Sequence, residues 1–486
     1  MRRGIFRSFN SSQRRFYIYK EHIFMRKFRE KYFGDADFYK MVFAVAVPIM
    51  IQNGITNFVN MLDNIMIGQI GTESMTGVSI VNQILIVYNL CIFGAVSGAG
   101  IFTAQYYGQK NTDGIRHTVR FKLLTGMAIT ALTILLLILC GQNLISFYLT
   151  GEGSAESIRA SMASGREYML LMLTGLPFFM ITQVYGSTLK ECGQTLLPMK
   201  AGVAAIFINL LFNYLLIYGK FGFPMLGVKG AAIATVLSRV VETGIIVIAT
   251  HRNKEGNPFV LGLYRSFAIP ADTVKKIAIK GTPLLLNETL WSAGMATLAA
   301  CYSLKGLNVV AALNISNTIC NLFHISFIAM GEAVAIIIGQ ILGTGDMKRA
   351  KETDTKIIVF AVLLCSVVAV VMFITAPLFP DFYNTSEDIR QLAAKLIMIS
   401  ALFVPQHALL NSLYFTLRSG GKTMLAFFFD SVFIWCISVV LAFALAKLTP
   451  LPILWIYFLV QLADGIKAVI GLVLVKKGVW LHNIVE

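Results

Sequence analysis

Long apolar stretches recur along the whole chain, and they constrain its fold more than any other feature. Each is about 20 residues or longer, the length that a helix needs to cross a hydrocarbon core of about 30 Å. Only 14% of the 486 residues are charged, against about a quarter in a soluble domain, and the mean hydropathy is +0.71. The sequence therefore predicts an all-α polytopic membrane protein. We expect twelve transmembrane helices, at residues 41–67, 78–107, 119–141, 166–189, 196–219, 228–250, 273–303, 309–342, 355–379, 393–417, 423–446 and 453–475.

The net charge of +16 would suggest a nucleic-acid partner in a soluble chain, but here the positions of the charges explain it. With the N-terminus in the cytoplasm, 31 of the 41 Lys and Arg residues lie in cytoplasmic connections and eight in external ones. Such a bias predicts that both termini are cytoplasmic. The basic surplus is therefore a topology signal first and an attraction to anionic lipid second, and no nucleic-acid partner is expected.

Residues 1–40 form a basic N-terminal tail that lacks the long apolar core of a cleavable signal peptide. Two interpretations stay open: a basic amphipathic helix on the inner leaflet, or a flexible tail. Translation from Met25 is a further alternative.

The chain repeats itself. At an offset of 235 residues Pro48 matches Pro283, Gln105 matches Gln340 and Gly108 matches Gly343. Later in each half the offset is 228, which aligns LKECGQT at 189–195 with LRSGGKT at 417–423, and Arg239 with Lys467. Each repeat has six spans, so both halves have the same orientation and enclose a central cleft as two pseudo-twofold-related lobes. The expected segments are the tail 1–40, an N-terminal lobe 41–250, a cytoplasmic linker 251–272, a C-terminal lobe 273–475 and a cytoplasmic tail 476–486.

Polar residues line one face of several spans at helical spacing. Gln52, Thr56, Asn60 and Asp63 form such a stripe in the first span. A stripe facing lipid would be costly, so these faces point to protein or water. The alternative for any single Asn or Ser is a hydrogen bond between helices. Further stripe residues are Asn287, Glu288 and Ser292 in the seventh span, and Asn317, Asn321 and Glu332 in the eighth.

The carboxylates of Asp63, Glu288 and Glu332 have no Lys or Arg three or four residues away. Each is therefore protonated, paired with a residue distant in sequence, or functional. In contrast, Arg239 with Glu242 and Asp464 with Lys467 are spaced to neutralise each other. Asp430 has no local partner, and its role is left open.

An unpaired carboxylate in a wet intramembrane cavity can bind Na⁺ with the help of Asn and Thr oxygens, or it can take up a proton. Either event removes the negative charge that would attract a cationic substrate. Cation entry and substrate release then compete, which is the physical basis of antiport.

Several segments resemble the multidrug and toxic compound extrusion (MATE) transporters. The series Pro48, Gln52-Asn53, Asn60 to Asp63, and Gly68 is similar to the family's first helix, and Asn209–Thr235 is similar to the signature across its fifth and sixth helices. PLLLNETLWSAG at 283–294, IIIGQILGTGD at 336–346 and LRSGGKT follow in the family's order. The resemblance covers about residues 40–475.

The resemblance implies monomeric efflux of drugs or metabolites, driven by Na⁺ or H⁺, across the bacterial cytoplasmic membrane. By position, Asp63 resembles the coupling acid of the N-terminal lobe, assisted by Asn60, Asn209 and Asn213, and Glu288 resembles the acid of the C-terminal lobe. The chain departs from the family where some relatives have an acid, at Asn213 and in the tenth span, so the coupling ion is not fixed. The residues expected in the substrate cavity are Gln52, Asn53, Thr56, Asn287, Ser292, Asn317, Asn321 and Glu332.

The sequence disfavours two other functions. A lipid-linked saccharide flippase of the same superfamily is disfavoured because the sequence predicts twelve spans and an acidic cavity, without the several Arg residues that bind pyrophosphate. An integral membrane enzyme is disfavoured because the chain has no HExxH, GxSxG or phosphate-loop motif. The seven cysteines form no CxxC pair and are expected to pack as small apolar residues, so neither a cofactor nor a structural metal is predicted.

Overall fold

The computed structural model describes residues 26–149, 154–383 and 385–486, without the side chains of residues 60, 61, 64 and 65. The expectations for the first 25 residues and for the Asn60 side chain therefore lie outside the described part. Throughout that part the long elements are α-helices and no strand is present, which confirms the all-α membrane fold. Six helices form the first half: α3 (Ala36–Gly68), α4 (Thr72–Gly108), α5 (Thr112–Tyr148), α6 (Ala155–Glu191), α7 (Leu196–Tyr218) and α8 (Val228–Arg252).

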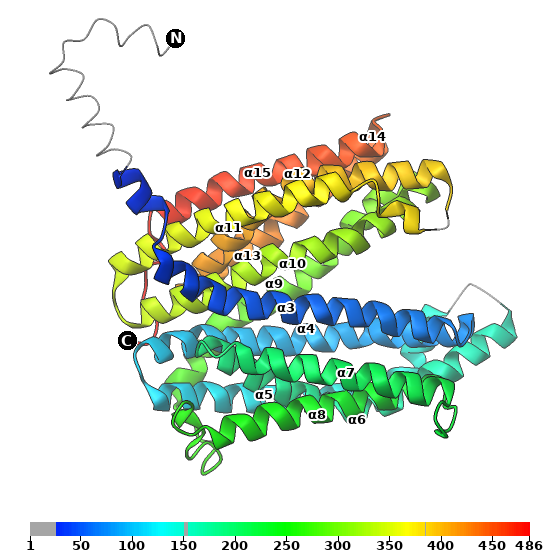
Figure 1. Cartoon of the computed structure of the whole chain (residues 1–486), viewed down its shortest axis with the longest axis horizontal. Helices are drawn as coiled ribbons and strands as arrows, with labels where there is room; N and C mark the ends of the chain where they lie inside the picture. Colours follow the sequence, from blue (N-terminus) through cyan, green and yellow to red (C-terminus); the bar gives the residue numbers. More distant parts are fainter. Residues whose placement is uncertain (1–25, 150–153, 384) are drawn as a thin grey trace, which may run out of the picture.

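The second half repeats this arrangement (Figure 1). Its fifth span, the eleventh of the chain, contains two π-helical segments, which loosen the helical hydrogen bonding around Asp430. Interior prolines occupy equivalent places in the halves: Pro48 in α3 and Pro283 in α9, then Pro177 in α6 and Pro405 in α12. The helices are α9 (Ala271–Ser303), α10 (Leu307–Gly343), α11 (Met347–Thr375), α12 (Glu387–Ser419), α13 (Thr423–Phe427) continuing through η4 (Phe428–Val432) and η5 (Ile434–Ser438) into α14 (Val439–Leu448), and α15 (Ile453–Lys476).

Each predicted span coincides with one of these helices. Several helices extend beyond the predicted apolar core; α6 and α11, for example, begin with a polar turn or more. In the described part eleven helices are long and apolar enough to cross a membrane, and α9 is the twelfth, with lysines in its first turns.

One end of the bundle holds the connections 109–111, 192–195, 253–270, 344–346 and 420–422 together with the C-terminus. We call it the basic end, because these connections and the helix ends that flank them carry most of the Lys and Arg residues of the described part. In Figure 1 the helices of the two halves lie closest together at this end, on the left, and diverge toward the other. The molecule is therefore closed at the basic end.

Helices α3 and α9 each join both halves. Near the basic end, Val42 and Ile49 of α3 belong to a core cluster with residues of α10, α11 and α12. Reciprocally, Ile277 and Leu284 of α9 pack with Ala99 and Phe102 of α4. Farther along, α3 turns to α7 of its own half. These crossings place polar residues of α3 beside the space between the halves.

The inter-lobe segment lies against the first half. The buried guanidinium of Arg120 donates to the carbonyl oxygens of Leu263 at 2.9 Å, Gly262 at 2.8 Å and Ala268 at 3.1 Å. One side chain thus satisfies three carbonyls that no regular secondary structure pairs. The segment includes the short helix η2 (Pro258–Val260).

Candidate functional site

A cavity of about 540 Å³ lies between the halves. Most of its wall comes from α3, α4, α6, α7 and α8, and the rest comes from α10 and α12. Three predicted polar residues of α3, Gln52, Asn53 and Thr56, line it together with Asp63. The structure therefore places these side chains of the α3 polar stripe against a central space, as the sequence led us to expect.

Asp63 is held by amide groups. Nδ2 of Asn213 on α7 donates to Oδ1 of Asp63 at 2.6 Å. Asn209 lies one turn earlier on the same face of α7, and with its amide nitrogen turned toward Asp63 it donates at 3.0 Å to Oδ1 and at 3.3 Å to Oδ2. In that orientation its oxygen accepts from the Thr235 hydroxyl at 3.3 Å. The structure thus brings together three residues that the sequence placed at one site.

No Lys, Arg or His nitrogen lies within 4.0 Å of Asp63 in the described part of the chain. The positive charge that acts on it is that of Arg239 on α8, which is itself bound to Glu242 at 2.9 Å. This confirms the predicted Arg239–Glu242 pair, although both residues line the cavity rather than serving packing alone. Arg239 also stacks over the Phe179 ring, 5.4 Å from its centroid. Asp63 therefore lines the cavity without a direct ionic partner among the described residues.

Oδ1 of Asn213, whose amide nitrogen binds Asp63, is buried without a hydrogen-bond donor among the described residues. Oε1 of Gln52 is also unsatisfied, but it lies about three helical turns from Asp63 along α3, near Gly202 and Glu242. Buried polar atoms are normally satisfied, so the unsatisfied oxygen beside the carboxylate needs an explanation. Amide and carboxylate oxygens together are the donor set that a hard cation prefers.

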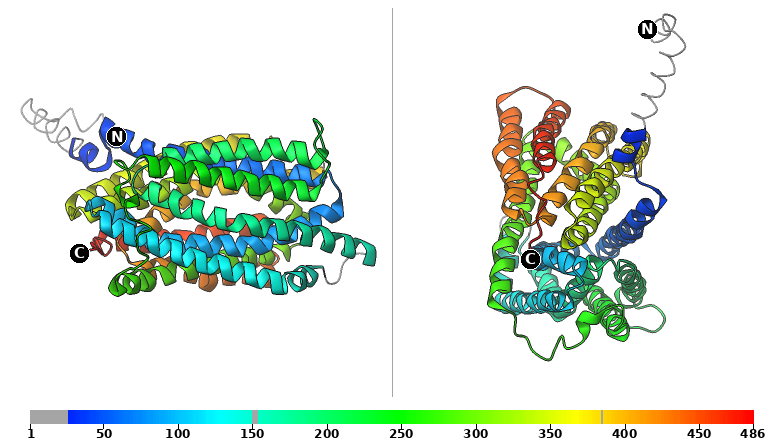
Figure 2. Two further views of the ribbon diagram at one scale, coloured as in Figure 1. Left: turned by 90° about the horizontal axis from the view of Figure 1, so that it is seen from below. Right: turned by 90° about the vertical axis from the view of Figure 1, so that its left-hand side faces the viewer.

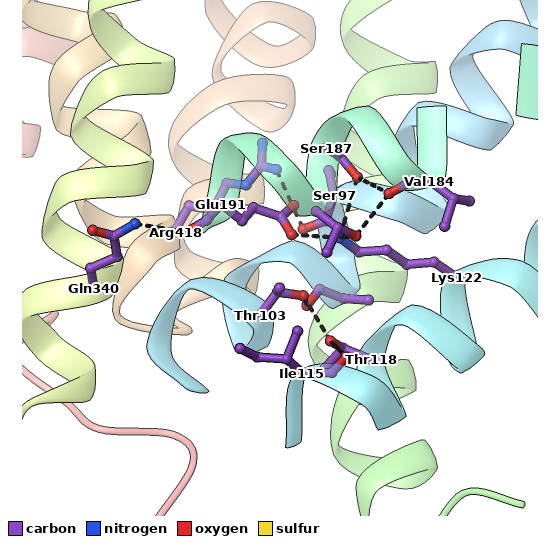
Figure 3. A network of polar contacts seen from close by, with 12 residues as sticks. Ser97, Thr103, Ile115, Thr118, Lys122, Val184, Ser187, Glu191, Gln340 and Arg418 are labelled. Atoms are coloured by element: carbon purple, nitrogen blue, oxygen red, sulfur yellow. Dashed lines mark hydrogen bonds and ion pairs between the residues drawn. The ribbon is translucent and has the colours of Figure 1, made fainter. Parts of the chain in front are cut away.

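The opposite wall of the cavity carries a second group of charges, nearer the basic end (Figure 3). Nζ of Lys190 on α6 lies 3.5 Å from Oε2 of Glu332 on α10, which pairs the two halves. Lys122 is fully buried and lies 2.5 Å from Glu191. Arg418 on α12 approaches the Ser97 carbonyl oxygen at 3.5 Å. Glu332, which the sequence left without a local partner, is thus paired with a residue distant in sequence.

The expectation of an acidic cavity is wrong. Its lining includes four acids, Asp63, Glu191, Glu242 and Glu332, but also Lys190, Arg239 and Arg418. The sequence missed Lys190 and Arg418 because each lies at the end of a span, where Lys and Arg usually face water. Arg239, in the middle of its span, was assigned only to its pair with Glu242. The internal repeat could have indicated that Lys190 and Arg418 have related roles, since it aligns the two residues.

A separate polar network fills the second half. Lys467 lies 2.5 Å from Asp430, and Nδ2 of Asn287 donates to the same carboxylate at 3.1 Å. The predicted pairing of Lys467 with Asp464 is therefore wrong: Asp464 instead accepts from Ser438 at 3.4 Å. The π-helical segment turns Asp430 toward α15 and α9, which the periodicity of an α-helix does not predict.

Four other predicted residues do not line this cavity. Asn317 and Asn321 are exposed on α10, while Ser292 and Glu288 are half-buried on α9. Arg418 and Asp430 are the charges that act on Glu288. Asn287 is buried in the network around Asp430. The two halves therefore contribute unequally to the cavity in this conformation.

The described residues contain no group of three His, Cys, Asp or Glu side chains that could hold a metal ion. All seven cysteines are free. Five of them are buried or partly buried, and Cys140 and Cys436 are exposed.

Two repeated groups of six helices around a cavity lined by charges from both define a membrane transporter of the two-lobed type. The chain belongs to the MatE family, whose model matches residues 48–215 and 283–444, one stretch in each half. This confirms the resemblance drawn from the sequence.

Among its relatives is a probable multidrug resistance protein NorM of Thermotoga maritima, 27% identical over 427 residues that cover 86% of this chain and 88% of the other. The multidrug resistance protein MdtK of Yersinia pseudotuberculosis is 24% identical over 375 residues, covering 77% and 79%. Solved structures share the fold. A MATE in complex with MaL6 has a TM-score of 0.80 at 18% identity and covers 91% of this chain and 96% of its own. A MOP superfamily transporter of Pyrococcus furiosus has a TM-score of 0.81 at 19% identity, with the same coverage.

Proposed function

We propose that this protein exports amphipathic organic cations in exchange for H⁺ or Na⁺ by alternating access of its two lobes. The multidrug relatives support the transport of drug-like compounds. Because they match most of the chain, they support a complete transporter with both lobes. The observation that carries the proposal is Asp63, a carboxylate in the intramembrane cavity whose direct partners are neutral amides.

Asp63 supplies the exchange chemistry. Its charge favours a cation in the cavity, and the coupling ion and the substrate therefore compete for it. For Na⁺, the unsatisfied oxygen of Asn213 is a suitable additional ligand. For H⁺, protonation of the carboxylate has the same electrostatic result. Asn53, Thr56 and Asn209 complete the polar wall, and Glu288 serves the second lobe as an attracting acid or a second ion site.

The charge distribution supports an orientation with the basic end in the cytoplasm, and both termini on that side. The conformation would then be closed to the cytoplasm. The bacterial relatives support a location in the bacterial cytoplasmic membrane. We propose a monomer, because both lobes and the cavity belong to one chain.

Other functions are less well supported. The cavity bases are the feature that an anionic lipid-linked saccharide would need, but two of the three are already paired with acids: Lys190 with Glu332 and Arg239 with Glu242. A flippase would need such bases free for pyrophosphate. An enzymatic activity has no support from membership of a transporter family.

The test is dye efflux from membrane vesicles under an imposed Na⁺ gradient and, separately, under an imposed pH gradient. One gradient should drive efflux by the wild type, and Asp63→Asn should abolish the gradient-driven part. Glu167→Gln is the matched control, because Glu167 is a half-exposed partner of Lys229 outside the cavity. Undiminished gradient-driven efflux by Asp63→Asn would overturn the role of Asp63.

A further inference from the structure

The closed basic end is held by contacts that obey the internal repeat. Helices α4 and α10 meet there through a glycine from each. A Cβ added at Gly108 would collide with the carbonyl oxygen of Gln340, and one added at Gly343 would collide with that of Gln105. Gly108 and Gly343 are equivalent positions of the internal repeat, and so are Gln105 and Gln340. Glycine at both positions is therefore what allows the backbones to meet this closely.

Each glutamine side chain reaches across to the last residue of a helix in the opposite half. Nε2 of Gln340 donates to the backbone oxygen of Glu191 at 2.8 Å, where α6 ends. Nε2 of Gln105 donates to the backbone oxygen of Ser419 at 2.9 Å, where α12 ends. Carbonyls in the last turn of a helix have no partner within that helix. Each amide therefore satisfies a group that would otherwise be left unpaired in the closed interface.

The next layer, closer to the cavity, follows the same symmetry. Lys190 and Arg418 are equivalent in the repeat, and so are their partners Glu332 and Ser97. Figure 3 shows Arg418, Ser97, Glu191 and Gln340 converging where the halves meet. The contacts are polar and span the halves, so separation of the lobes at this end must break them.

The symmetry fails at one point, the C-terminal segment. It runs from the end of α15 in the second half to α4 in the first, and the right-hand view of Figure 2 shows it between the two groups of helices. The backbone N–H of Ile484 donates to Oε1 of Gln105 at 2.8 Å, and Nε2 of Gln105 also approaches the His482 oxygen at 3.3 Å. Gln340 has no comparable third partner in the described part of the chain.

The segment is anchored at both ends of its path. Trp480 is completely buried in the core of the second half, and its Nε1 donates to the Val475 oxygen at 3.1 Å. Ile484 is 8% exposed and packs with Ala99 and Phe102 of α4 and with Leu284 of α9. The segment therefore bridges the same two halves as the glutamines.

We propose that Gln105 and Gln340 are the gating residues of the cytoplasmic side, and that the segment 478–486 latches Gln105 and so biases the transporter toward the closed gate. The proposal rests on the proposed transport function, because opening of the basic end matters only if the lobes alternate. The contacts that close the basic end are present in the structure in either case. It predicts an asymmetry. Gln105 and Gln340 are equivalent in the internal repeat, but only Gln105 should be coupled to the C-terminal segment.

The experiment measures the populations of closed and open basic ends by spin–spin distances in lipid nanodiscs. Labels are placed at Lys254→Cys and Lys348→Cys, which are exposed on different halves at this end, in a cysteine-free background. The variants are Gln105→Met, Gln340→Met, Ile484→Pro, and deletion of residues 482–486, which leaves the buried Trp480 in place. Proline at 484 removes the N–H donor together with the Ile484 side chain, and it keeps the rest of the segment.

Each single variant should raise the open-to-closed ratio about three- to tenfold, the effect of losing one to two net hydrogen bonds. The effect of either change in the segment on the open-to-closed ratio should multiply with the effect of Gln340→Met. Combined with Gln105→Met, the same change should add much less, because the change in the segment and Gln105→Met remove the same interaction. An unchanged ratio in both segment variants, or equal multiplication with both glutamine variants, overturns the proposal. Dye efflux by the wild type is measured separately, so a failure of the transport function would show in that assay and leave the distance result intact.

Discussion

The ammonium of Lys467 lies 2.5 Å from Oδ1 of Asp430 and joins α15 to the π-helical part of the eleventh span. Both side chains are largely buried, with 9% and 17% exposure. Removing one partner of a buried ion pair leaves an uncompensated charge in a medium of low polarity. Asp430→Asn or Lys467→Met should therefore destabilise the fold by about 3 kcal/mol.

The measurement is thermal unfolding of the detergent-solubilised protein. Each single variant should lower the Tm clearly, and the double variant should recover part of the loss, because no charge is then left unpaired. Asp464→Asn is the matched control, since Asp464 lies three residues from Lys467 without binding it. A Tm loss for Asp464→Asn as large as that for Asp430→Asn would contradict the observed pairing.

Asn213→Leu should weaken coupling without removing the carboxylate of Asp63. The substitution keeps the side-chain size but removes both the 2.6 Å hydrogen bond and the unsatisfied oxygen. Loss of a group that positions a cation-binding carboxylate typically costs about tenfold or more in activity. Dye efflux at graded coupling-ion concentrations should show this as a higher half-saturating concentration. Asn143→Leu, at an exposed position on α5, should leave the curve unchanged.

The ion pair of Lys190 and Glu332 should respond to a charge swap. Both side chains are about a quarter exposed or less, so the pair contributes modestly, and breaking it should shift the gate about two- to fivefold toward opening. Lys190→Glu alone should open the basic end more strongly, because two acids then face each other. The double variant Lys190→Glu with Glu332→Lys should restore the closed population in the distance measurement. If the swap is no better than the single variant, the pair does not hold the gate.

The helices could be predicted from the sequence because each depends on local information. An apolar run of sufficient length determines a span, and α7 (Leu196–Tyr218), the fifth predicted span, begins and ends where the hydropathy predicts. The repeat was likewise visible in single residues such as Pro48 and Pro283, which the structure places inside equivalent helices.

The charge pairs could not be predicted, since they join residues far apart in sequence. Lys190 and Glu332 belong to different halves, and no spacing rule connects them. Asp464 is three residues from Lys467 and satisfies the local rule, but Asp430 lies closer in space because the helix around it is wound differently. The resemblance to the family, and not a spacing rule, placed Asn209 and Asn213 beside Asp63, and the structure shows the hydrogen bond from Asn213.

Gly108→Ala and Gly343→Ala should each hinder closure of the basic end. The added methyl group would overlap a carbonyl oxygen of the opposite half, and backbone atoms cannot move aside as a flexible side chain can. The open state has no such contact, so the substitution should raise the open-to-closed ratio and slow the transport cycle. Gly244→Ala is the matched control, because a Cβ there meets no atom within 4 Å, and alanine is the better helix former by about 1 kcal/mol. Distances between the labels at positions 254 and 348 should therefore lengthen for the two interface variants and stay at the wild-type value for Gly244→Ala. Equal distances in all three would mean that the glycine contacts do not limit how closely the lobes meet.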